Sequence, residues 1–205
     1  MPRPTQAFID LSALAHNLGV VRQYVPCSRI MAVVKADAYG HGLLHTASAL
    51  KDVDGFALLE LDAAISLRDA GYQQPILLLE GFFSTEELAL FEQYRLSAVI
   101  HHSEQIAMLS DSKHHNLDLF LKINTGMNRL GLAPEQFPQI MKALTDHPGI
   151  DSITLMTHFA SADDPLEEDE VFQQLQYFEA ITQNHKYPHS LANSAAIIRY
   201  PVTHA

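Results

Sequence analysis

The stretch RIMAVVKADAYGHGLLHTASALKDVDGFALL, residues 29–59, decides the fold class. It begins with an apolar, β-branched run of strand length, Arg29–Lys35, and ends with a second such run, Gly55–Leu59. Between them, Gly42–Lys51 has the longer amphipathic pattern that is typical of a helix. A strand, a helix and a second strand in this order predict a parallel β/α unit.

The same alternation continues to the end of the sequence. The strands are apolar on both faces, as expected for strands covered by helices. Seven strands are predicted, whereas a closed (β/α)8 barrel needs eight. We therefore expect an α/β protein, either a TIM-type (β/α)8 barrel truncated after its seventh strand or an open sheet, with residues 1–205 as one incomplete barrel domain that lacks a C-terminal β domain. The further strands expected are Pro75–Glu80, Ser97–His101, Leu117–Asn124, Ile150–His158 and Ser190–Asn193, and the further helices are Glu60–Ala70, Thr85–Tyr94, Ser103–Ser110, Pro134–Thr145, Leu166–Asn184 and an initial Ser12–Tyr24 with Ser12 as its N-cap.

The composition is that of an acidic globular protein. Of its 205 residues 47% are hydrophobic, and 13 basic against 24 acidic side chains give a formal net charge of −11. This balance disfavours nucleic acid and anionic membranes as partners. No apolar run approaches the ~20 residues that a membrane-spanning helix needs, and the first residues lack the continuous apolar segment of a signal peptide. Because Cys27 is the only cysteine, no internal disulfide is expected and a cytoplasmic location is predicted.

Reactive side chains follow several of the predicted strands. In a barrel of this kind the working residues lie at the carboxyl ends of the strands. Lys35 closes the first strand and is either a nucleophilic amine or a lysine that simply reaches solvent. Arg129, just past the fifth strand, could bind a carboxylate or phosphate, or could lie in a surface turn. His158 closes the sixth strand as a pocket or core residue, and Asn193 and Ser194 open a helix whose amides could bind phosphate or only be capped.

Other reactive side chains are not expected to form a site. No pair of carboxylates follows the strands, which disfavours glycosidase chemistry. His41 and His45 have helical spacing without a glutamate between them, so zinc peptidase chemistry is not expected and no metal site is predicted. Those expected at the surface or away from the strand ends are His101, His102, His114, His115, Cys27 and the acidic segment Asp163–Glu170.

Four motifs give the sequence a family resemblance. They are VVKADAYGHG at 33–42, LKINTGMNRLGL at 121–132, MTHFASADD at 156–164 and LANSAA at 191–196. In this order and spacing they resemble the alanine racemases, enzymes that depend on pyridoxal 5′-phosphate (PLP) and have the fold type III barrel. The resemblance covers essentially the whole chain. It implies racemisation of L- and D-alanine, which would supply D-alanine for peptidoglycan in the cell wall.

The resemblance also implies a role for each residue at the strand ends. Lys35 would hold PLP covalently through its ε-amine and act as the base on the D-alanine side. Arg129 would contact the phenolic oxygen of the cofactor and the carboxylate of the substrate. Tyr39 would donate a hydrogen bond to the cofactor phosphate, and His158 would lie beside the pyridine ring. The phosphate site would further include Asn193 and Ser194.

The sequence differs from the family pattern at one position and in length. Lys122 matches a lysine that many members carry as a carbamate, which helps to orient the arginine, but the aspartate often found two residues later is Asn124 here. Members also continue through an eighth strand and a C-terminal β domain, and their second base is a tyrosine from the partner subunit of a homodimer. The resemblance therefore implies that residues 1–205 alone are not a competent racemase.

Three other functions stay open at this point. A PLP-binding homeostasis protein has the same barrel and a chain of this length class, and it does not racemise. A broad-specificity or serine racemase would share the motifs, because they do not report the size of the substrate pocket. The third is a phosphate-binding barrel that takes no PLP.

Overall fold

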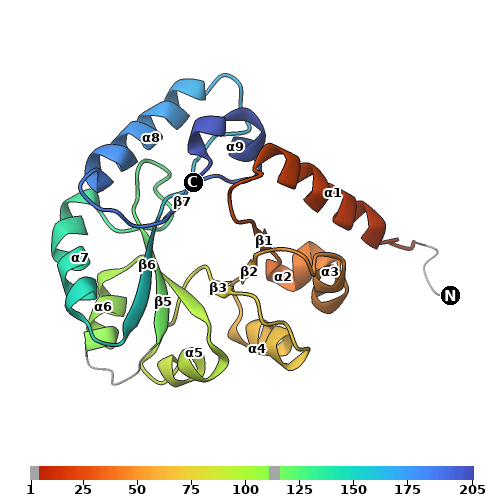
Figure 1. The fold of residues 1–205 in the computed structure, drawn as a ribbon, viewed down its shortest axis with the longest axis horizontal. Helices are drawn as coiled ribbons and strands as arrows, with labels where there is room; N and C mark the ends of the chain where they lie inside the picture. The colour runs from red at the N-terminus through yellow and green to blue at the C-terminus, as the bar shows by residue number, and fades with distance from the viewer. Residues whose placement is uncertain (1–4, 111–115) are drawn as a thin grey trace.

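A computed structural model describes residues 5–110 and 116–205. Its centre is one curled sheet of seven parallel strands, paired in sequence order (Figure 1). Helical segments join each strand to the next and lie on the outside of the curl. The strands are β1 (Met31–Val33), β2 (Gly55–Leu58), β3 (Ile76–Leu78), β4 (Ser97–Ile100), β5 (Leu117–Lys122), β6 (Ile150–Met156) and β7 (His189–Ser190).

The helices cover the sheet through amphipathic faces. The clearest is α7, which buries Phe137, Ile140, Met141 and Leu144 at the spacing of one helical face.

No helix in the described part of the chain is long and apolar enough to cross a membrane. The helical segments are α1 (Leu11–Tyr24), α2 (Lys35–Gly40), α3 (Leu43–Ala49), α4 (Leu61–Asp69), α5 (Leu88–Tyr94), α6 (Ser103–Ser110), η1 (Pro134–Gln136), α7 (Phe137–Asp146), α8 (Glu168–Thr182), α9 (Ser194–Arg199) and η2 (Pro201–Thr203).

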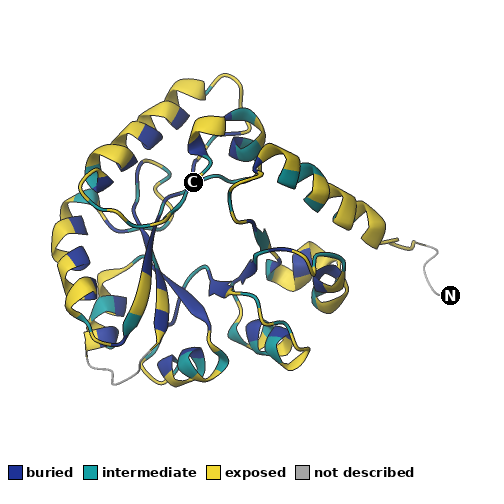
Figure 2. Ribbon diagram, viewed as in Figure 1, coloured by how far each residue is buried: buried dark blue, intermediate teal, exposed yellow. Residues whose placement is uncertain are grey.

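Both faces of the sheet are buried, but they build cores of different size. The outward-pointing side chains, such as Phe56 and Leu58, join the large core beneath the helices (Figure 2). The inward-pointing side chains of Ala57, Leu77 and Val99 form a small second core inside the curl. Burying one Phe or Leu side chain stabilises the fold by about 1.5–3 kcal/mol, so the populous outer core contributes most of the stability.

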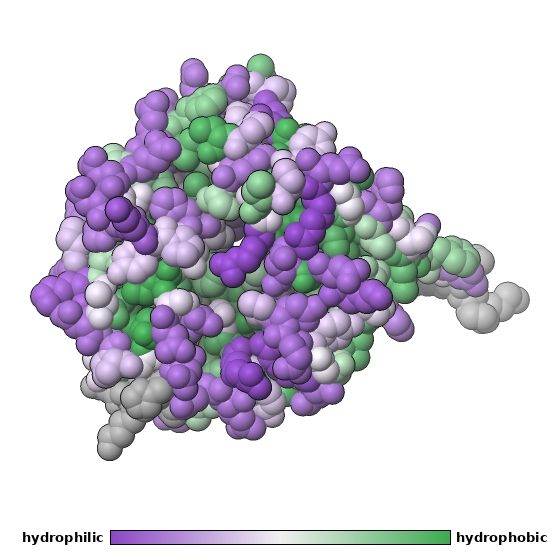
Figure 3. All heavy atoms as spheres, in the orientation of Figure 1, coloured by the Kyte–Doolittle hydropathy of each residue, from purple (hydrophilic) through white to green (hydrophobic). Residues whose placement is uncertain are grey.

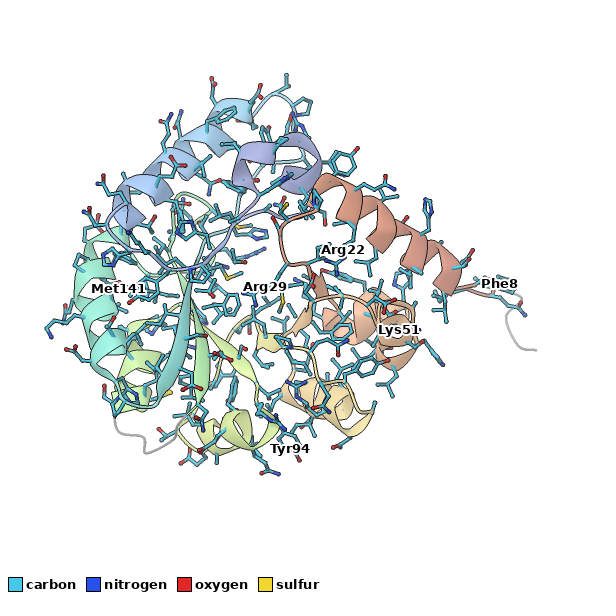
Figure 4. The ribbon with its side chains drawn as sticks, viewed as in Figure 1. Phe8, Arg22, Arg29, Lys51, Tyr94 and Met141 are labelled. Atoms are coloured by element: carbon cyan, nitrogen blue, oxygen red, sulfur yellow. The ribbon has the colours of Figure 1, made fainter. Side chains whose placement is uncertain are left out.

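The ring of strands is not closed. Among the described residues, β1 pairs with β2 alone and β7 pairs with β6 alone. A cavity of about 130 Å³ lies between these two edges, lined by residues 29–31 on one side and 189–192 on the other, and Figure 4 labels Arg29 there. The structure thus confirms the predicted TIM-type barrel that is open after seven strands.

The predicted N-cap of the first helix is wrong by two residues. The helix begins at Leu11, and the Asp10 carboxylate accepts hydrogen bonds from the backbone N–H groups of Ser12 (2.9 Å) and Ala13 (3.1 Å). The Ser12 hydroxyl also donates to this carboxylate, at 2.6 Å. A charged acceptor that serves two amides therefore caps the helix, and Ser12 lies inside it.

Other element boundaries also differ from prediction. The first strand ends at Val33 rather than at Lys35, because the chain enters a separate turn there. The helices predicted from residues 85 and 166 begin at Leu88 and Glu168, after short turns. The predicted surface histidines His114 and His115 lie outside the described residues.

Candidate functional site

The segment after β1 turns in the left-handed sense. Residues 36–39 of α2, none of them glycine, have φ between 51° and 57°. L-amino acids disfavour this conformation by about 1–2 kcal/mol per residue. Hydrogen bonds hold it: Ala38 N–H donates to the Val34 carbonyl at 3.0 Å, and the Asp37 carboxylate accepts from Leu43 N–H at 2.7 Å, at the start of α3. The conformation is therefore imposed by the surrounding contacts.

This turn brings Lys35 and Tyr39 together at the carboxyl-terminal mouth of the barrel. The Lys35 ammonium nitrogen lies 6.0 Å from the centroid of the Tyr39 ring. Tyr39 is 59% exposed, and Lys35 is half-buried. The amine and the phenol are therefore both accessible to a ligand at the mouth.

The loop after β5 doubles back on the end of its own strand. Asn124 N–H donates to the Leu132 carbonyl (3.0 Å), and Leu132 N–H donates to the Lys122 carbonyl (2.9 Å). Gly131 allows this approach, since it has a φ of 135° and a Cβ there would lie 2.7 Å from the Asn124 nitrogen. The loop thereby carries Arg129 at its exposed tip.

Asn124 organises this loop through both ends of its amide. Its oxygen accepts from the N–H groups of Gly126 (3.2 Å) and Asn128 (3.0 Å), and its nitrogen donates to the Asn128 side-chain oxygen (2.9 Å). An ionised aspartate could accept these bonds but could not donate the third. Asn124 thus orders the loop that carries Arg129 with an uncharged side chain.

The ends of β6 and β7 contribute one imidazole and one helix start. His158 is half-buried just past β6. The Asn193 oxygen accepts from Ala196 N–H at 3.0 Å, and its nitrogen donates to the Phe159 carbonyl at 3.3 Å. Asn193 therefore caps α9, and Ser194 is exposed, so that the proposed phosphate role of the two residues stays a prediction.

Four side chains at the mouth affect one another's charge: Lys35, Lys122, Arg129 and His158. Burial lowers the pKa of Lys122, which is only 7% exposed, and repulsion from Arg129 and Lys35 lowers it further. Burial, followed by the charges of Lys122, Arg129 and Lys35, lowers the pKa of His158 to about 4. At neutral pH, His158 is therefore an uncharged imidazole beside three cations.

The positive charge at the mouth is not compensated. Within residues 5–110 and 116–205, Lys35, Lys122 and Arg129 form no ion pair with a carboxylate. The carboxylate of Glu80 acts on Lys122 in the opposite sense, but its effect is the smallest. A chain with a net charge of −11 thus holds a cationic site that suits a small anion.

The prediction that His101 lies at the surface is wrong, whereas His102 is exposed as predicted. His101 is half-buried, its Nε2 lies 3.0 Å from the Glu80 carbonyl, and burial together with the nearby charge of Lys122 lowers its pKa. Its position could have been found from the alternation along β4, since Val99 faces the interior and His101 follows two residues later.

Comparison with known proteins decides the family. The family model "Alanine racemase, N-terminal domain" matches residues 9–205, nearly the whole chain. The chain belongs to the alanine racemase family. The resemblance carried by the four sequence motifs is thereby confirmed.

Curated alanine racemases from Nitrosospira multiformis and Nitrosomonas europaea are 57% and 59% identical to the chain over 206 and 208 residues. Each match covers 100% of this chain and 58% of the relative, so the chain spans little more than half the length of the relatives it matches. The solved biosynthetic alanine racemase from Pseudomonas aeruginosa is similar with a TM-score of 0.88 and 40% identity, covering 96% of this chain and 55% of that chain. A histidine racemase from Leuconostoc mesenteroides is similar with a TM-score of 0.81 and 30% identity, covering 93% of this chain and 53% of that chain.

The donor set of this alanine racemase barrel fits PLP. The cofactor has an aldehyde that reacts with a primary amine, and it carries a phosphate and a phenolic oxygen that cations stabilise. Lys35 offers the amine, and Arg129 offers a positive charge that forms no ion pair with a carboxylate among the described residues. Tyr39 and Ser194 are exposed and can donate hydrogen bonds to a phosphate.

Proposed function

We propose that residues 1–205 form the PLP-binding N-terminal barrel domain of an alanine racemase whose substrates are L- and D-alanine. The observation that carries this proposal is the meeting of the Lys35 amine with the Arg129 guanidinium and the buried amine of Lys122, beside an uncharged His158. Membership in the alanine racemase family supports the same assignment.

The chemistry divides between the cofactor and the chain. PLP, when bound, supplies an electron sink that makes the α-proton of an amino acid easier to remove. Lys35 would hold the cofactor, and its amine would accept the α-proton on the D-alanine side. Arg129 would bind the substrate carboxylate and the phenolic oxygen, and the uncharged His158 would lie beside the pyridine ring without adding to the positive charge.

The phosphate and the arginine each need a supporting group. Tyr39, Asn193 and Ser194 are the proposed phosphate site, with Asn193 acting through the helix start that it caps. Lys122 is the proposed carbamate: its lowered pKa favours the neutral amine, which adds carbon dioxide to form an N–C bond and releases a proton. The resulting anion would supply a negative charge beside Arg129. Asn124 is uncharged and supplies none.

Racemisation requires a second base on the opposite face of the α-carbon. We propose that it is a tyrosine of the partner subunit in a homodimer of the complete protein, so that residues 1–205 alone do not racemise. D-alanine for peptidoglycan is the proposed use of the product. No nucleic acid or membrane partner is proposed, and the cytoplasmic location stays a prediction.

A racemase for another amino acid is the second candidate. A histidine racemase has a similar barrel at 30% identity to this chain, so the shared fold does not dictate the substrate side chain. Competition among alanine, serine and histidine for exchange of the α-proton in the complete protein would separate the candidates. The alanine assignment requires alanine to exchange fastest.

PLP capture tests the proposal. The purified chain is mixed with PLP, and its visible absorbance is recorded before and after borohydride, alongside Lys35→Ala and Lys51→Ala. Lys51 is an exposed lysine beyond the end of α3 and serves as the matched control. A reducible covalent adduct in the original chain and in Lys51→Ala, but not in Lys35→Ala, is the expected result, and equal adducts in all three would contradict the assignment.

Exchange of the α-proton separates the racemase from a PLP homeostasis protein. In deuterated water, a chain that holds PLP as a racemase domain is expected to exchange the α-proton of D-alanine faster than that of L-alanine, since Lys35 serves the D-alanine side. A chain that forms the reducible adduct but exchanges neither would be a passive PLP carrier. A chain that forms no adduct would favour the phosphate-binding barrel.

A further inference from the structure

A buried glutamine outside the mouth joins the two segments that carry Arg129 and His158. Gln174 lies on α8 and is only 5% exposed. Its side-chain oxygen accepts from Ala160 N–H at 2.9 Å, and its side-chain nitrogen donates to the His158 carbonyl at 3.1 Å. The same nitrogen lies 3.3 Å from the Thr125 hydroxyl, on the loop after β5. Both ends of one amide are therefore used, and they reach two different loops.

The hydrogen bonds beyond Gln174 form a chain with a single direction. Thr157 donates its hydroxyl proton to the Ile123 carbonyl at 3.0 Å. Because a hydroxyl has one proton, the 2.7 Å contact between Thr125 and Thr157 must use the proton of Thr125. Thr125 then accepts from the Gln174 nitrogen, which fixes the orientation of the amide. A buried chain with every donor used is cooperative and costly to break.

Packing joins the same two segments. A Cβ added to Gly126 would lie 3.3 Å from Cγ of Gln174, so the backbone of the Arg129 loop rests on the glutamine stem. Gly126 is three residues before Arg129, and Gln174 holds the backbone on both sides of Phe159. Through Gln174, α8 therefore contacts both the loop that carries Arg129 and the segment that carries His158.

We propose that Gln174 is a positioning residue that holds segments 125–129 and 158–160 in one arrangement, so that Arg129 and His158 face the same bound anion. The inference rests on the proposed function only for the choice of PLP as that anion. Gln174 itself does not touch the ligand.

The first test reads the position of His158 without any cofactor. The charged groups that face its ring are Lys35 from α2, Lys122 from β5 and Arg129 from the following loop. NMR titration would measure the pKa of His158 in the original chain and in Gln174→Met, with the signal identified by its loss in His158→Asn. Gln173→Met is the matched control, because Gln173 is the exposed neighbour on the same helix.

Loss of the Gln174 amide should loosen segment 158–160 and admit water to the His158 ring. We expect the pKa of His158 to rise from about 4 toward 6.5 in Gln174→Met and to stay unchanged in Gln173→Met. Gln174→Glu keeps the size of the side chain but, when ionised, cannot donate to the His158 carbonyl. Because its negative charge would itself raise the pKa of His158, this variant is compared by PLP affinity alone. This second variant keeps the proposal testable if the methionine variant does not fold.

The second test uses PLP affinity, measured by titration of the reducible adduct. We expect affinity to fall about tenfold in both Gln174 variants and to change less than about twofold in Gln173→Met. Variants that unfold at lower temperature yet keep the His158 pKa and the PLP affinity would show a merely structural role and overturn the proposal. If the original chain binds no PLP but the His158 pKa still shifts, the proposed function fails while the positioning role stands.

Discussion

At the scale of single residues, the mouth of the barrel brings Lys35, Lys122 and Arg129 together with no ion pair to a carboxylate in the part of the chain that the structure describes. Lys122 is buried there, and His158 is held uncharged by burial and by three neighbouring cations. Folding therefore carries an electrostatic cost that a bound anion would offset.

His158 should make the fold less stable in mild acid. Its pKa is about 4 in the folded chain against an ordinary 6.5, so the unfolded chain binds an additional proton between these values. The free energy of unfolding therefore has its full value above pH 6.5 and decreases as the pH falls toward 4. After allowance for the partial exposure of the ring, we expect a decrease of about 2 kcal/mol. Urea unfolding above pH 6.5 and between pH 6.5 and about 4 measures the change in the free energy of unfolding.

The control for this prediction is His158→Asn, which cannot take up the proton. His101 and His189 also have lowered pKa values through burial, so the variant should retain part of the pH dependence. An unchanged dependence in His158→Asn would show that His158 does not titrate as described.

Lys122 should form a carbamate more readily than an exposed lysine. Its lowered pKa enlarges the fraction of neutral amine, which is the form that reacts with carbon dioxide. With ¹³C-labelled bicarbonate, a carbamate carbon resonance is expected that disappears in Lys122→Met and survives in Lys142→Met, an exposed lysine on α7. Loss of the signal in both variants, or in neither, would exclude Lys122 as its source.

At the scale of elements, α2 contains the longest run of left-handed non-glycine residues in the described part of the chain. Four consecutive residues adopt a left-handed conformation that glycine accepts without steric cost. The turn persists because its hydrogen bonds, including that from Leu43 to Asp37, hold it from both ends. Strain that places Lys35 beside Tyr39 is consistent with a functional site.

Ala36→Gly should stabilise the chain, although glycine destabilises ordinary helices. Relief of about 1–2 kcal/mol of left-handed strain exceeds the entropic cost of about 0.5–1 kcal/mol, which leaves a net gain of about 0.5–1 kcal/mol. Ala13→Gly, at an exposed position of the right-handed α1, should instead destabilise by about 1 kcal/mol. Urea unfolding of both variants measures the two signs, and destabilisation by both would contradict the strained turn.

At the scale of the whole molecule, hydrophobic patterning predicted most of the architecture. Each of the seven predicted strands is present, in a sheet whose order follows the sequence. The reason is physical: buried parallel strands need continuous apolar runs, and the covering helices need one apolar face. Figure 3 shows hydrophilic side chains around much of the outline, with hydrophobic patches between them.

The remaining features depend on particular hydrogen bonds, which hydrophobic patterning does not report. The left-handed φ values of α2 occur together with the hydrogen bond from Leu43 N–H to the Asp37 carboxylate, and a run of alanine and aspartate does not predict them. His101 is half-buried because the strand end places it against the Glu80 carbonyl. Gln174 could have been noticed, since it shares a helical face with the buried Val171 and Phe178, but its partners could not.

Lys35 is the proposed amine that holds PLP at the mouth of this barrel. The most direct measurement is mass spectrometry of the borohydride-reduced chain after digestion, because Lys122 offers a competing, buried amine in the same site. We expect one modified peptide, the one that contains Lys35. A label on Lys122, or one spread over exposed lysines such as Lys51, would contradict it.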